Sequence, residues 1–311
     1  MIKKIRIGSR SSVLAQIQAR IVRDSIIKFR NDLQKDDFEI VPISTRGDWR
    51  PGQKEQTFLD MGANKGLFTK EIEEALATGG INMAVHSMKD VPSEIPENLI
   101  FAAILLRGDA RDCFVSNKAA TLDALPAESR VGSSSLRRQA QVLARRPDLR
   151  VVPFRGNVDT RLRKLEEGVV DATLLAVAGL ERLGKLNHAA SILDVQTILP
   201  APGQGAVGIQ IRRNDEEMLR YLAPVNDENT ALCVAAERAA LKELDGTCRA
   251  PVAALATITG ERLMLDVLAA KPDGTLIERA SGEGPASDAA ALGKDLGQKI
   301  KGRLPSGFFS S

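Results

Sequence analysis

The chain repeats one local plan, in which a short apolar strand runs into a serine turn and then into a helix. The plan first occurs at residues 3–12 and again at residues 130–136. Helix patterns at 68–78 and 158–167 end at glycine and continue into strand patterns at 81–86 and 169–176. Alternation of strand and helix with short connections is typical of parallel α/β sheets. We therefore expect two similar α/β halves that face each other across a cleft.

Periodicity predicts which helix faces are buried. In the first helix, Leu14, Ile17, Ile21, Ser25 and Phe29 recur at steps of three and four residues, which predicts one buried face.

The second half of the chain changes its pattern twice. Residues 199–225 are rich in proline and glycine and contain an apolar strand at 206–211, which we interpret as a return to the first half. From residue 229 the pattern predicts a helix at 230–244, a cysteine loop, three strands with turns at 260–261 and 273–274, and a final helix at 287–301. We thus expect an α/β domain at 1–105 and 206–225, a second α/β domain at 106–205, and an α+β domain at 226–311. The polar residues 44–65 read as a long mobile loop.

Composition excludes several classes of protein. The net charge of +3 over 311 residues is too small to indicate nucleic-acid binding, and 4% aromatic residues do not favour base stacking. No apolar run approaches the roughly 20 residues that span a bilayer. The N-terminus reads as a strand and lacks the features of a signal peptide. We expect a cytoplasmic protein with no nucleic-acid or membrane partner.

Cysteine and histidine are too sparse to suggest a disulfide framework or a metal centre. The three cysteines are widely spaced, and the two histidines have no partners at ligand spacing. Cys113 and Cys233 lie in apolar runs and are expected to be inert core thiols. Cys248 lies in a loop beside Arg249, where a thiol can become nucleophilic. We expect His86 to be packed at the end of a strand.

Positive charge is concentrated in one segment. Residues 130–164 hold nine Arg and one Lys against Asp148 and Asp159, a local excess of eight. A solvated basic face on two helices would explain such a run. However, Arg137 and Arg138 fall in the first turn of a helix, where the macrodipole disfavours cations. A serine-rich helix N-terminus with adjacent arginine is a ready anion site, so carboxylate or phosphate ligands fit this segment.

Two further patterns carry competing interpretations. Asp90 follows a strand at its carboxyl end, where α/β folds place ligands, yet Asp before Val-Pro is also a common turn residue.

The sequence Gly203–Gly208 matches the G-x-G-x-x-G dinucleotide pattern. It precedes an apolar strand instead of following one, so we reject it as a nucleotide-binding loop.

Six stretches together resemble the porphobilinogen deaminase family. They run in family order within a resemblance that extends from Arg6 to about Leu304: 85–92, 131–139, 155–162, 175–180, 202–208 and the cysteine loop 246–251. The resemblance implies two α/β domains of the periplasmic-binding-protein type plus a C-terminal α+β domain that bears the cofactor cysteine. The chain departs from the family at Ala63-Asn64, where the family usually has two glycines.

The resemblance also implies the site residues. It implies a dipyrromethane cofactor, one per chain, joined by a thioether to Cys248, and it makes Asp90 the central catalytic carboxylate. Cofactor-binding residues would be Ser87, Lys89, Asp90, Ser133, Ser135, Arg137 and Arg138. Substrate-binding residues would be Arg10, Ser12, Gln18, Lys65, Phe68, Arg155, Arg161 and Arg182.

The implied activity is the head-to-tail condensation of four porphobilinogen molecules with loss of ammonia, followed by hydrolytic release of hydroxymethylbilane. We hypothesise that Asp90 stabilises the azafulvene-type cation left by ammonia and acts as a general acid and base. Movement between rounds is expected in loop 44–65 and at hinges near 105–110 and 199–205. We expect a monomer. The alternatives are a non-catalytic two-domain protein that binds anionic ligands, and a nucleic-acid-binding role for the arginine-rich segment.

Overall fold

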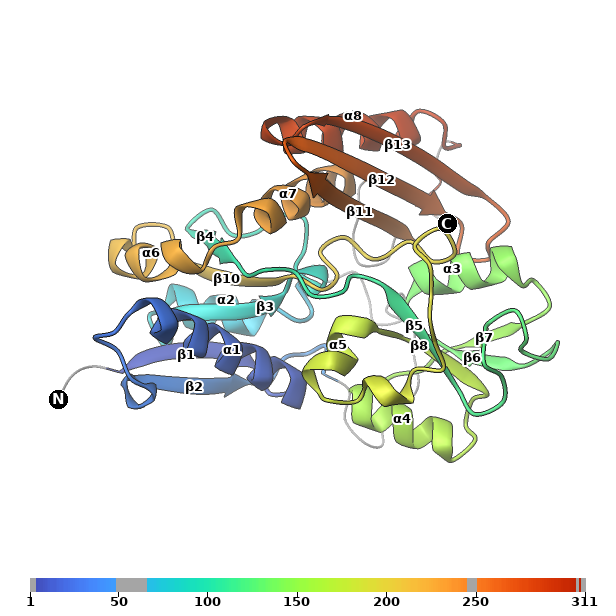
Figure 1. The fold of residues 1–311 in the computed structure, drawn as a ribbon, viewed down its shortest axis with the longest axis horizontal. Helices are drawn as coiled ribbons and strands as arrows, with labels where there is room; N and C mark the ends of the chain where they lie inside the picture. Colours follow the sequence, from blue (N-terminus) through green and yellow to red (C-terminus); the bar gives the residue numbers. More distant parts are fainter. Residues whose placement is uncertain (1–3, 49–65, 245–250, 306–307, 309–311) are drawn as a thin grey trace. The chain divides into compact units, whose positions relative to one another are not determined.

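The computed structural model describes residues 4–48, 66–244, 251–305 and 308. The described residues form three β-sheets (Figure 1). They divide into two compact units, the first with residues 4–48, 66–108 and 206–231, and the second with residues 109–205 and those from 232 onward.

The first unit is built on a five-stranded sheet of order β2-β1-β3-β10-β4. Strand β1 pairs in parallel with β2 and β3, whereas β10 is antiparallel to β3 and β4. The strands are β1 (Ile5–Arg10), β2 (Phe38–Ile43), β3 (Met83–Ser87), β4 (Leu99–Ile104) and β10 (Val207–Arg212). The helices are α1 (Val13–Phe29), α2 (Lys70–Ala77) and α6 (Glu216–Leu222), with short 3-10 turns at Lys35–Asp37, Met88–Asp90 and Ala223–Val225.

The predicted buried face of α1 is wrong by one position around the helix. The helix buries Ala15, Ala19, Val22 and Ile26, whereas Ile21 is 37% exposed and Phe29 is 53% exposed. Apolar residues occupy two adjacent faces of this helix, so periodicity alone does not choose between them. Two alanines on the buried face allow the helix to lie close against β1 and β3, with which it packs.

The second unit contains a sheet with the same plan, of order β7-β6-β8-β5-β9. Strand β6 pairs in parallel with β7 and β8, and β5 pairs antiparallel with β8 and β9. The strands are β5 (Asp112–Ser116), β6 (Arg130–Gly132), β7 (Arg150–Val152), β8 (Ala172–Ala176) and β9 (Ser191–Ile192). The helices are α3 (Leu136–Arg145), α4 (Val158–Glu166) and α5 (Val177–Arg182), with a 3-10 turn at Leu186–His188.

The remainder of the second unit is an antiparallel meander covered by helices. Its strands are β11 (Val252–Thr259), β12 (Arg262–Ala270) and β13 (Ile277–Pro285), and its helices are α7 (Glu228–Glu243) and α8 (Ala289–Lys301), with a 3-10 turn at Ala286–Asp288. The meander also packs on α3, through a buried cluster that joins Ala140 of α3 to Leu268 of β12. Both observed turns, at 260–261 and 273–274, lie where the sequence predicted them.

The expected fold class, two α/β halves and an α+β module, is confirmed by these three sheets. The limits 1–105 with 206–225, 106–205 and 226–311 stay a prediction. Of the loop predicted at 44–65, residues 49–65 lie outside the described residues. None of the described helices has the length and hydropathy needed to cross a membrane.

Candidate active site

In the first unit, three polar side chains meet at the carboxyl edge of the sheet. Arg10 is the last residue of β1, Asp90 follows β3, and Asp48 follows β2. The Arg10 guanidinium donates through Nη1 to Asp90 Oδ2 at 3.3 Å and through Nε to Asp48 Oδ1 at 3.0 Å. The side chains of Arg10 and Asp90 are 25% and 28% exposed, so both remain accessible from solvent. Parallel strands bring these residues together because their carboxyl ends share one edge.

An aromatic ring completes this group. The Arg10 guanidinium carbon lies 4.2 Å from the centroid of the Phe68 ring, a cation–π contact. Gly47 faces the same ring, and a Cβ there would lie 2.2 Å from Phe68 Cε1. Glycine at 47 therefore gives Phe68 room to stack on Arg10.

Ser12, Gln18 and Ser87 act locally in the described structure. Ser12 caps α1 by accepting from the Ala15 amide at 3.3 Å. The buried Gln18 amide and the Ser87 hydroxyl lie 3.0 Å apart, which ties α1 to the end of β3. Lys89 is half-buried in the 3-10 turn that carries Asp90.

Asp48 was missed in the sequence analysis. Its Oδ2 accepts from both the amide and the hydroxyl of Thr45, at 2.9 and 3.0 Å, so the carboxylate is held facing Arg10. A threonine three residues before an acidic residue is a capping-type spacing and is the one local signal that could have drawn attention to it.

In the second unit, the serine turn after β6 satisfies its own backbone. Ser133 Oγ accepts from the Ser135 amide at 3.1 Å, and Ser135 caps α3 by accepting from the Arg138 amide at 3.4 Å. Ser134 Oγ accepts from the Phe154 amide at 3.0 Å and so links this turn to the end of β7. These hydrogen bonds hold the serine turn in place and thereby position the first turn of α3.

Arg137 and Arg138 are buried around one carboxylate. Arg138 Nη2 donates to Asp112 Oδ1 at 2.7 Å, and Arg137 Nη2 lies 2.8 Å from Asp112 Oδ2. Arg137 also donates through Nη1 to the Leu199 carbonyl at 2.7 Å. Their side chains are 6% and 8% exposed, and burial lowers the pKa of Arg137. Two cations facing one anion leave a net positive charge in a nearly dry place, which is costly unless a further anion arrives.

This cluster fits the acidic cofactor that the family resemblance implies. The Nε atoms of Arg137 and Arg138 are buried, and within the described part of the chain neither has a hydrogen-bond partner. Buried donors are normally paired, and guanidinium groups prefer carboxylate acceptors. The residues present are therefore suited to a ligand with acetate and propionate side chains.

Three further arginines lie beyond the carboxyl edge of the same sheet. Arg155 is buried, and its carbonyl accepts from Lys164 Nζ at 3.1 Å. Arg161 Nε donates to the Gly156 carbonyl at 2.9 Å. Arg182 Nη2 donates to the Gly205 carbonyl at 2.7 Å, and burial lowers the pKa of Arg182.

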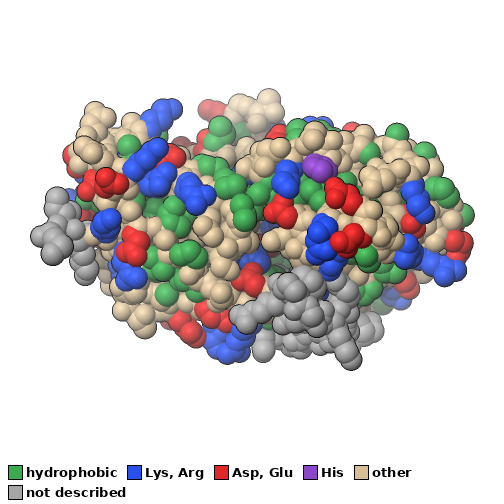
Figure 2. Space-filling model, turned by 90° about the horizontal axis from the view of Figure 1, so that it is seen from below, with side chains coloured by type: hydrophobic (Ala, Val, Ile, Leu, Met, Phe, Trp, Pro, Cys, Tyr) green, Lys and Arg blue, Asp and Glu red, His purple; other side chains and the backbone are tan. Residues whose placement is uncertain are grey.

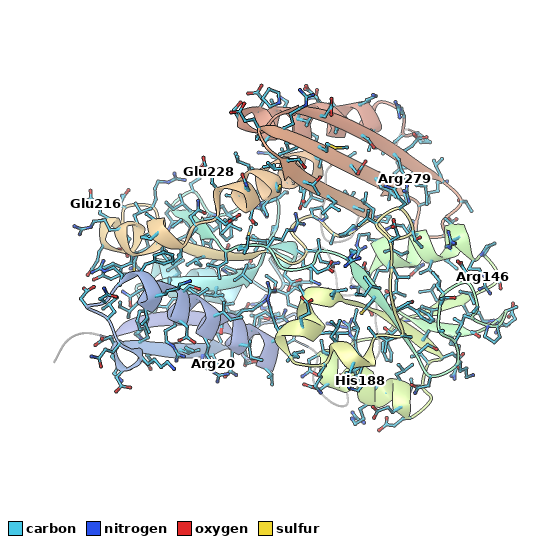
Figure 3. The ribbon with its side chains drawn as sticks, in the orientation of Figure 1. Arg20, Arg146, His188, Glu216, Glu228 and Arg279 are labelled. Atoms are coloured by element: carbon cyan, nitrogen blue, oxygen red, sulfur yellow. The ribbon has the colours of Figure 1, made fainter. Side chains whose placement is uncertain are left out.

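Four other arginines of the basic segment form ion pairs near the surface. Each pairs with an acidic residue of the surface: Arg145 with Asp123, Arg146 with Asp148, Arg150 with Glu128, and Arg163 with Glu167. Arg146 is labelled at the end of α3 in Figure 3, and Figure 2 shows Lys and Arg interspersed with Asp and Glu on one face of the molecule. The simple interpretation of a solvated basic run is thus correct for the exposed Arg145, Arg150 and Arg163. It is wrong for the buried Arg137, Arg138 and Arg155, and Arg146, which is 16% exposed, also donates to the carbonyls of Leu122, Asp123 and Leu125.

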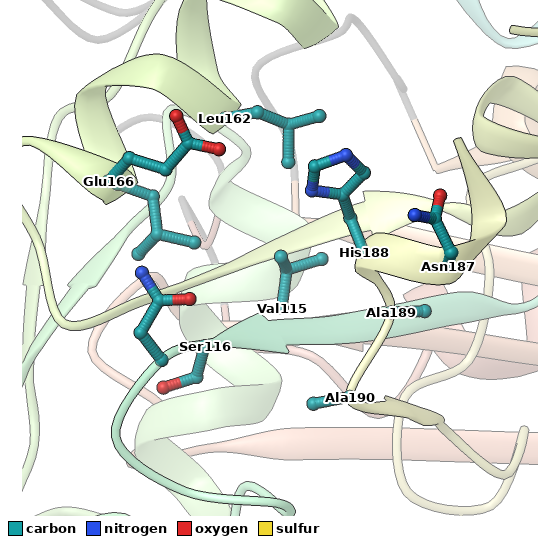
Figure 4. A pocket seen from close by; sticks show the side chains of 10 residues that line it. Val115, Ser116, Leu162, Glu166, Asn187, His188, Ala189 and Ala190 are labelled. Carbon is teal, nitrogen blue, oxygen red and sulfur yellow. The ribbon is translucent and has the colours of Figure 1, made fainter.

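A pocket of about 280 Å³ lies elsewhere in the second unit (Figure 4). Its lining includes Ser116, Glu166 and His188. Ser116 ends β5, whereas Asp112 begins it, so the pocket and the buried arginines are separated along the strand by roughly 13 Å at ~3.3 Å per residue. The lining includes no residue that the sequence analysis assigned to the site.

The expected burial of Cys113, Cys233 and His86 is confirmed. Cys113 and Cys233 are buried thiols, and burial raises the pKa of the Cys113 thiol to about 11. His86 is 5% exposed, and burial lowers its pKa to about 4. Cys248 and Lys65 lie outside the described residues. Among the residues that the structure describes, no group of three His, Cys, Asp or Glu side chains could hold a metal ion.

The structure therefore gathers the predicted residues into two groups. Arg10, Phe68 and Asp90 form one in the first unit, and Ser133, Ser135, Arg137 and Arg138 form another in the second. Their individual roles stay predictions.

Comparison with known proteins points to one family. Residues 5–220 match the family described as "Porphobilinogen deaminase, dipyromethane cofactor binding domain", and residues 231–302 match "Porphobilinogen deaminase, C-terminal domain". Porphobilinogen deaminase of Paracoccus denitrificans (strain Pd 1222) is 48% identical over 305 residues, 98% of this chain and 96% of the relative. The chloroplastic porphobilinogen deaminase of Oryza sativa subsp. japonica is 48% identical over 311 residues, 99% of this chain and 86% of the relative.

Solved structures are more distant. The methionine-binding protein MetQ aligns with a TM-score of 0.45 at 14% identity, over 76% of this chain and 96% of that protein. The periplasmic VFT2 domain of BvgS from Bordetella pertussis aligns with a TM-score of 0.43 at 16% identity, over 76% of this chain and 94% of that domain.

Proposed function

Because the chain belongs to the porphobilinogen deaminase family, we propose which of its residues carry out that family's reaction. The protein is a transferase of tetrapyrrole biosynthesis that uses a dipyrromethane cofactor. It joins four porphobilinogen molecules head to tail with loss of ammonia, and hydrolysis then releases hydroxymethylbilane.

The substrate explains the number of buried cations. Porphobilinogen bears one acetate and one propionate, so every condensation adds two negative charges to the bound chain. We assign Ser133, Ser135, Arg137 and Arg138 to the carboxylates of the cofactor. The substrate-binding set would be Arg10, Ser12, Gln18, Lys65, Phe68, Arg155, Arg161 and Arg182. The support is the buried Nε–H groups of Arg137 and Arg138, which have no hydrogen-bond partner among the described residues and which a carboxylate would satisfy.

Asp90 is the proposed catalytic residue. Its carboxylate would face the cation that forms as the C–N bond of the aminomethyl arm breaks and ammonia leaves with the bonding electrons. When bound, the dipyrromethane would supply the free pyrrole α-carbon that the first condensation requires. The proton lost from that carbon would pass through Asp90 to solvent.

The observation that carries this assignment is the contact of Asp90 with Arg10. It holds a half-exposed carboxylate at the carboxyl edge of the sheet, beside a guanidinium that is itself stacked on Phe68. A carboxylate so placed is oriented by its partner and still open to a ligand. Ser87, Lys89 and Gln18 are assigned to the same neighbourhood, with Gln18 fixing Ser87.

Intact-mass spectrometry of the purified protein tests both parts of the proposal. The wild-type chain should weigh more than its amino acids by one dipyrromethane, and porphobilinogen should add further pyrrole units stepwise. Cys248→Ser should lose the adduct, whereas Cys233→Ser should keep it because Cys233 is a buried core thiol. Asp90→Ala should keep the adduct and lose nearly all turnover, at least ~100-fold, which is the low end for a group that acts on transferred protons.

Three outcomes would contradict the proposal. A bare wild-type mass would remove the covalent cofactor, and unchanged turnover in Asp90→Ala would remove Asp90 from its role. Return of unmodified porphobilinogen from a tight complex would favour a non-catalytic binding protein.

The proposal includes a cytoplasmic monomer with no nucleic-acid partner. Light scattering coupled to gel filtration would check the monomer, and cell fractionation would check the location.

A further inference from the structure

Asp112 lies at the centre of the buried arginine cluster. It begins β5, the antiparallel strand of its sheet, and its side chain is 0% exposed. Both of its carboxylate oxygens face guanidinium groups, Arg138 Nη2 at 2.7 Å from Oδ1 and Arg137 Nη2 at 2.8 Å from Oδ2. Arg137 and Arg138 are consecutive residues, so without an anion between them two like charges would lie side by side in a dry site.

The carboxylate also compensates the position of these arginines on their helix. Both occupy the first turn of α3, which begins at Leu136 and is capped by Ser135. The free amides there make this end of the helix positive and disfavour cations. A buried aspartate offsets part of the positive charge of the helix end and of the two side chains.

Gln204 shares the Asp112 Oδ1 atom with Arg138. Its Nε2 donates to Asp112 Oδ1 at 2.9 Å and to the Ala110 carbonyl at 2.7 Å, and its side chain is buried. Gln204 belongs to the glycine-rich turn that the sequence analysis rejected as a nucleotide loop, and the turn is followed by β10, as that rejection required.

The turn that carries Gln204 is itself anchored on both sides. Gly203 and Gly205 have positive φ angles of 74° and 87°, which favour glycine. The Gly203 amide donates to Glu237 Oε2 at 2.6 Å, and the Gly205 carbonyl accepts from Arg182 Nη2 at 2.7 Å. Glu237 also accepts from the Ala256 amide at 2.8 Å, so it ties the turn to α7 and β11, the elements that precede and follow Cys248 in the sequence.

We infer that Asp112, held by Gln204, is a positioning residue for the dipyrromethane site. Its carboxylate takes the Nη2 edges of Arg137 and Arg138 and thereby leaves their Nε–H groups for the carboxylates of the bound pyrroles. The inference rests on the proposed function, because it takes these two arginines as the cofactor's partners. It adds a role for two residues, Asp112 and Gln204, outside the set expected from the sequence.

The test measures uptake of the cofactor and not only turnover. Cofactor-free wild type and Asp112→Asn are incubated with porphobilinogen, and the rate at which the adduct mass appears is followed in the folded fraction. Asp112→Asn keeps the shape and removes the charge. We expect adduct formation to slow by about 10- to 100-fold, the scale of loss when binding groups are misplaced by ~1 Å.

Asp171→Asn is the matched control. Asp171 is a buried carboxylate of the same sheet that also holds cations, Lys118 at 2.7 Å and Arg130 at 3.7 Å, but it lies before β8, at the opposite edge. It should lose thermal stability yet take up the cofactor at the wild-type rate. If Asp112→Asn does not fold, Gln204→Met serves as the test variant, because it removes only the amide that holds Asp112. It should also slow cofactor uptake, by a smaller factor than Asp112→Asn.

Non-additivity identifies the route of the effect. If Asp112 acts through Arg138, then in a chain that already carries Arg138→Gln the added Asp112→Asn change should slow cofactor uptake only slightly more. Wild-type uptake in Asp112→Asn or in Gln204→Met, an equal loss in Asp171→Asn, or full additivity with Arg138→Gln would each overturn the inference. Absence of any adduct in wild type would instead overturn the proposed function.

Discussion

At the scale of single residues, buried polar groups of the first unit are ordered by their partners. Gln210 Nε2 donates to Glu73 Oε1 at 3.1 Å, so its Oε1 must accept from His86 Nε2 at 3.1 Å. Neutral His86 therefore carries its proton on Nε2. Burial raises the pKa of Glu73 and lowers that of His86 to about 4. The fold thus favours a neutral imidazole at the end of β3.

This burial predicts a pH dependence of stability. An unfolded histidine binds a proton below about pH 6.5, whereas folded His86 stays neutral down to about pH 4. As the pH falls through this window the unfolded chain gains a proton that the folded chain does not, so stability decreases, by up to about 3 kcal/mol. Above pH 6.5 the full stability is present.

The variant His86→Gln should lose this part of the pH profile. Thermal unfolding between pH 4.5 and 7.5 should show the largest advantage of wild type over the variant at pH 7.5 and a smaller one towards pH 4.5. His188→Gln, at the half-buried histidine of the pocket, should run parallel to wild type. A difference in unfolding temperature between wild type and His86→Gln that stays constant from pH 4.5 to 7.5 would contradict the assigned effect of burial on the His86 pKa.

At the scale of elements, glycine decides how α8 lies on α7. Gly293 and Gly297 are one helical turn apart and face the second helix. A Cβ on Gly293 would lie 2.1 Å from the Ala236 carbonyl oxygen, and one on Gly297 would lie 2.9 Å from the Ala240 carbonyl oxygen. At Gly293 the two nearest atoms belong to the Ala236 backbone, so no side chain can move aside to make room there.

Gly293→Ala should therefore destabilise the protein, although alanine usually stabilises a helix interior by ~1 kcal/mol relative to glycine. Separation of the two helices should cost about 1–3 kcal/mol, as for overpacked cores. Urea unfolding followed by far-UV circular dichroism measures the loss. Gly302→Ala, where the nearest atom would be 3.5 Å from the new Cβ, should be close to neutral. Equal or greater stability of Gly293→Ala would refute the close approach.

At the scale of the whole molecule, the meander and the five-stranded sheet of the second unit share one interface. Leu268 of β12 is fully buried in a cluster with Ala140 of α3, Leu199 and Ala253. At the turn before β13, Gly274 approaches α3 so closely that a Cβ would lie 2.5 Å from the Ala144 amide nitrogen. Arg279 of β13, labelled in Figure 3, donates to the Gln196 carbonyl at 3.3 Å. These contacts couple the two sheets energetically.

Leu268→Ala should loosen both sheets of this unit together. A cavity at a fully buried leucine costs about 2–5 kcal/mol, and hydrogen exchange should rise in α3 as well as in β12. Leu99→Ala is the control, because Leu99 is buried in the first unit, and it should raise exchange in β4 and leave α3 protected. Faster exchange confined to β12 would show that the meander unfolds independently.

The sequence by itself determined whatever depends on neighbours along the chain. The repeated strand, serine turn and helix at 3–12 and 130–136, the meander with its turns at 260–261 and 273–274, and Asp90 at the end of a strand were all read from local patterns. The family motifs are also local runs, and they contain Asp90, Arg137 and Arg138. Local patterns suffice there because caps, turns and helix faces involve residues only a few positions apart.

Only the tertiary structure decided which distant groups meet. Asp112 forms hydrogen bonds with Arg138 and Gln204, which lie 26 and 92 residues later in the sequence. His86 forms one with Gln210, 124 residues later. These pairs exist because β5 and β10 run antiparallel beside parallel strands, an order that no local pattern encodes. The buried face of α1 was decided in the same way, since two faces were apolar and the sheet beneath selected the one with the smaller side chains.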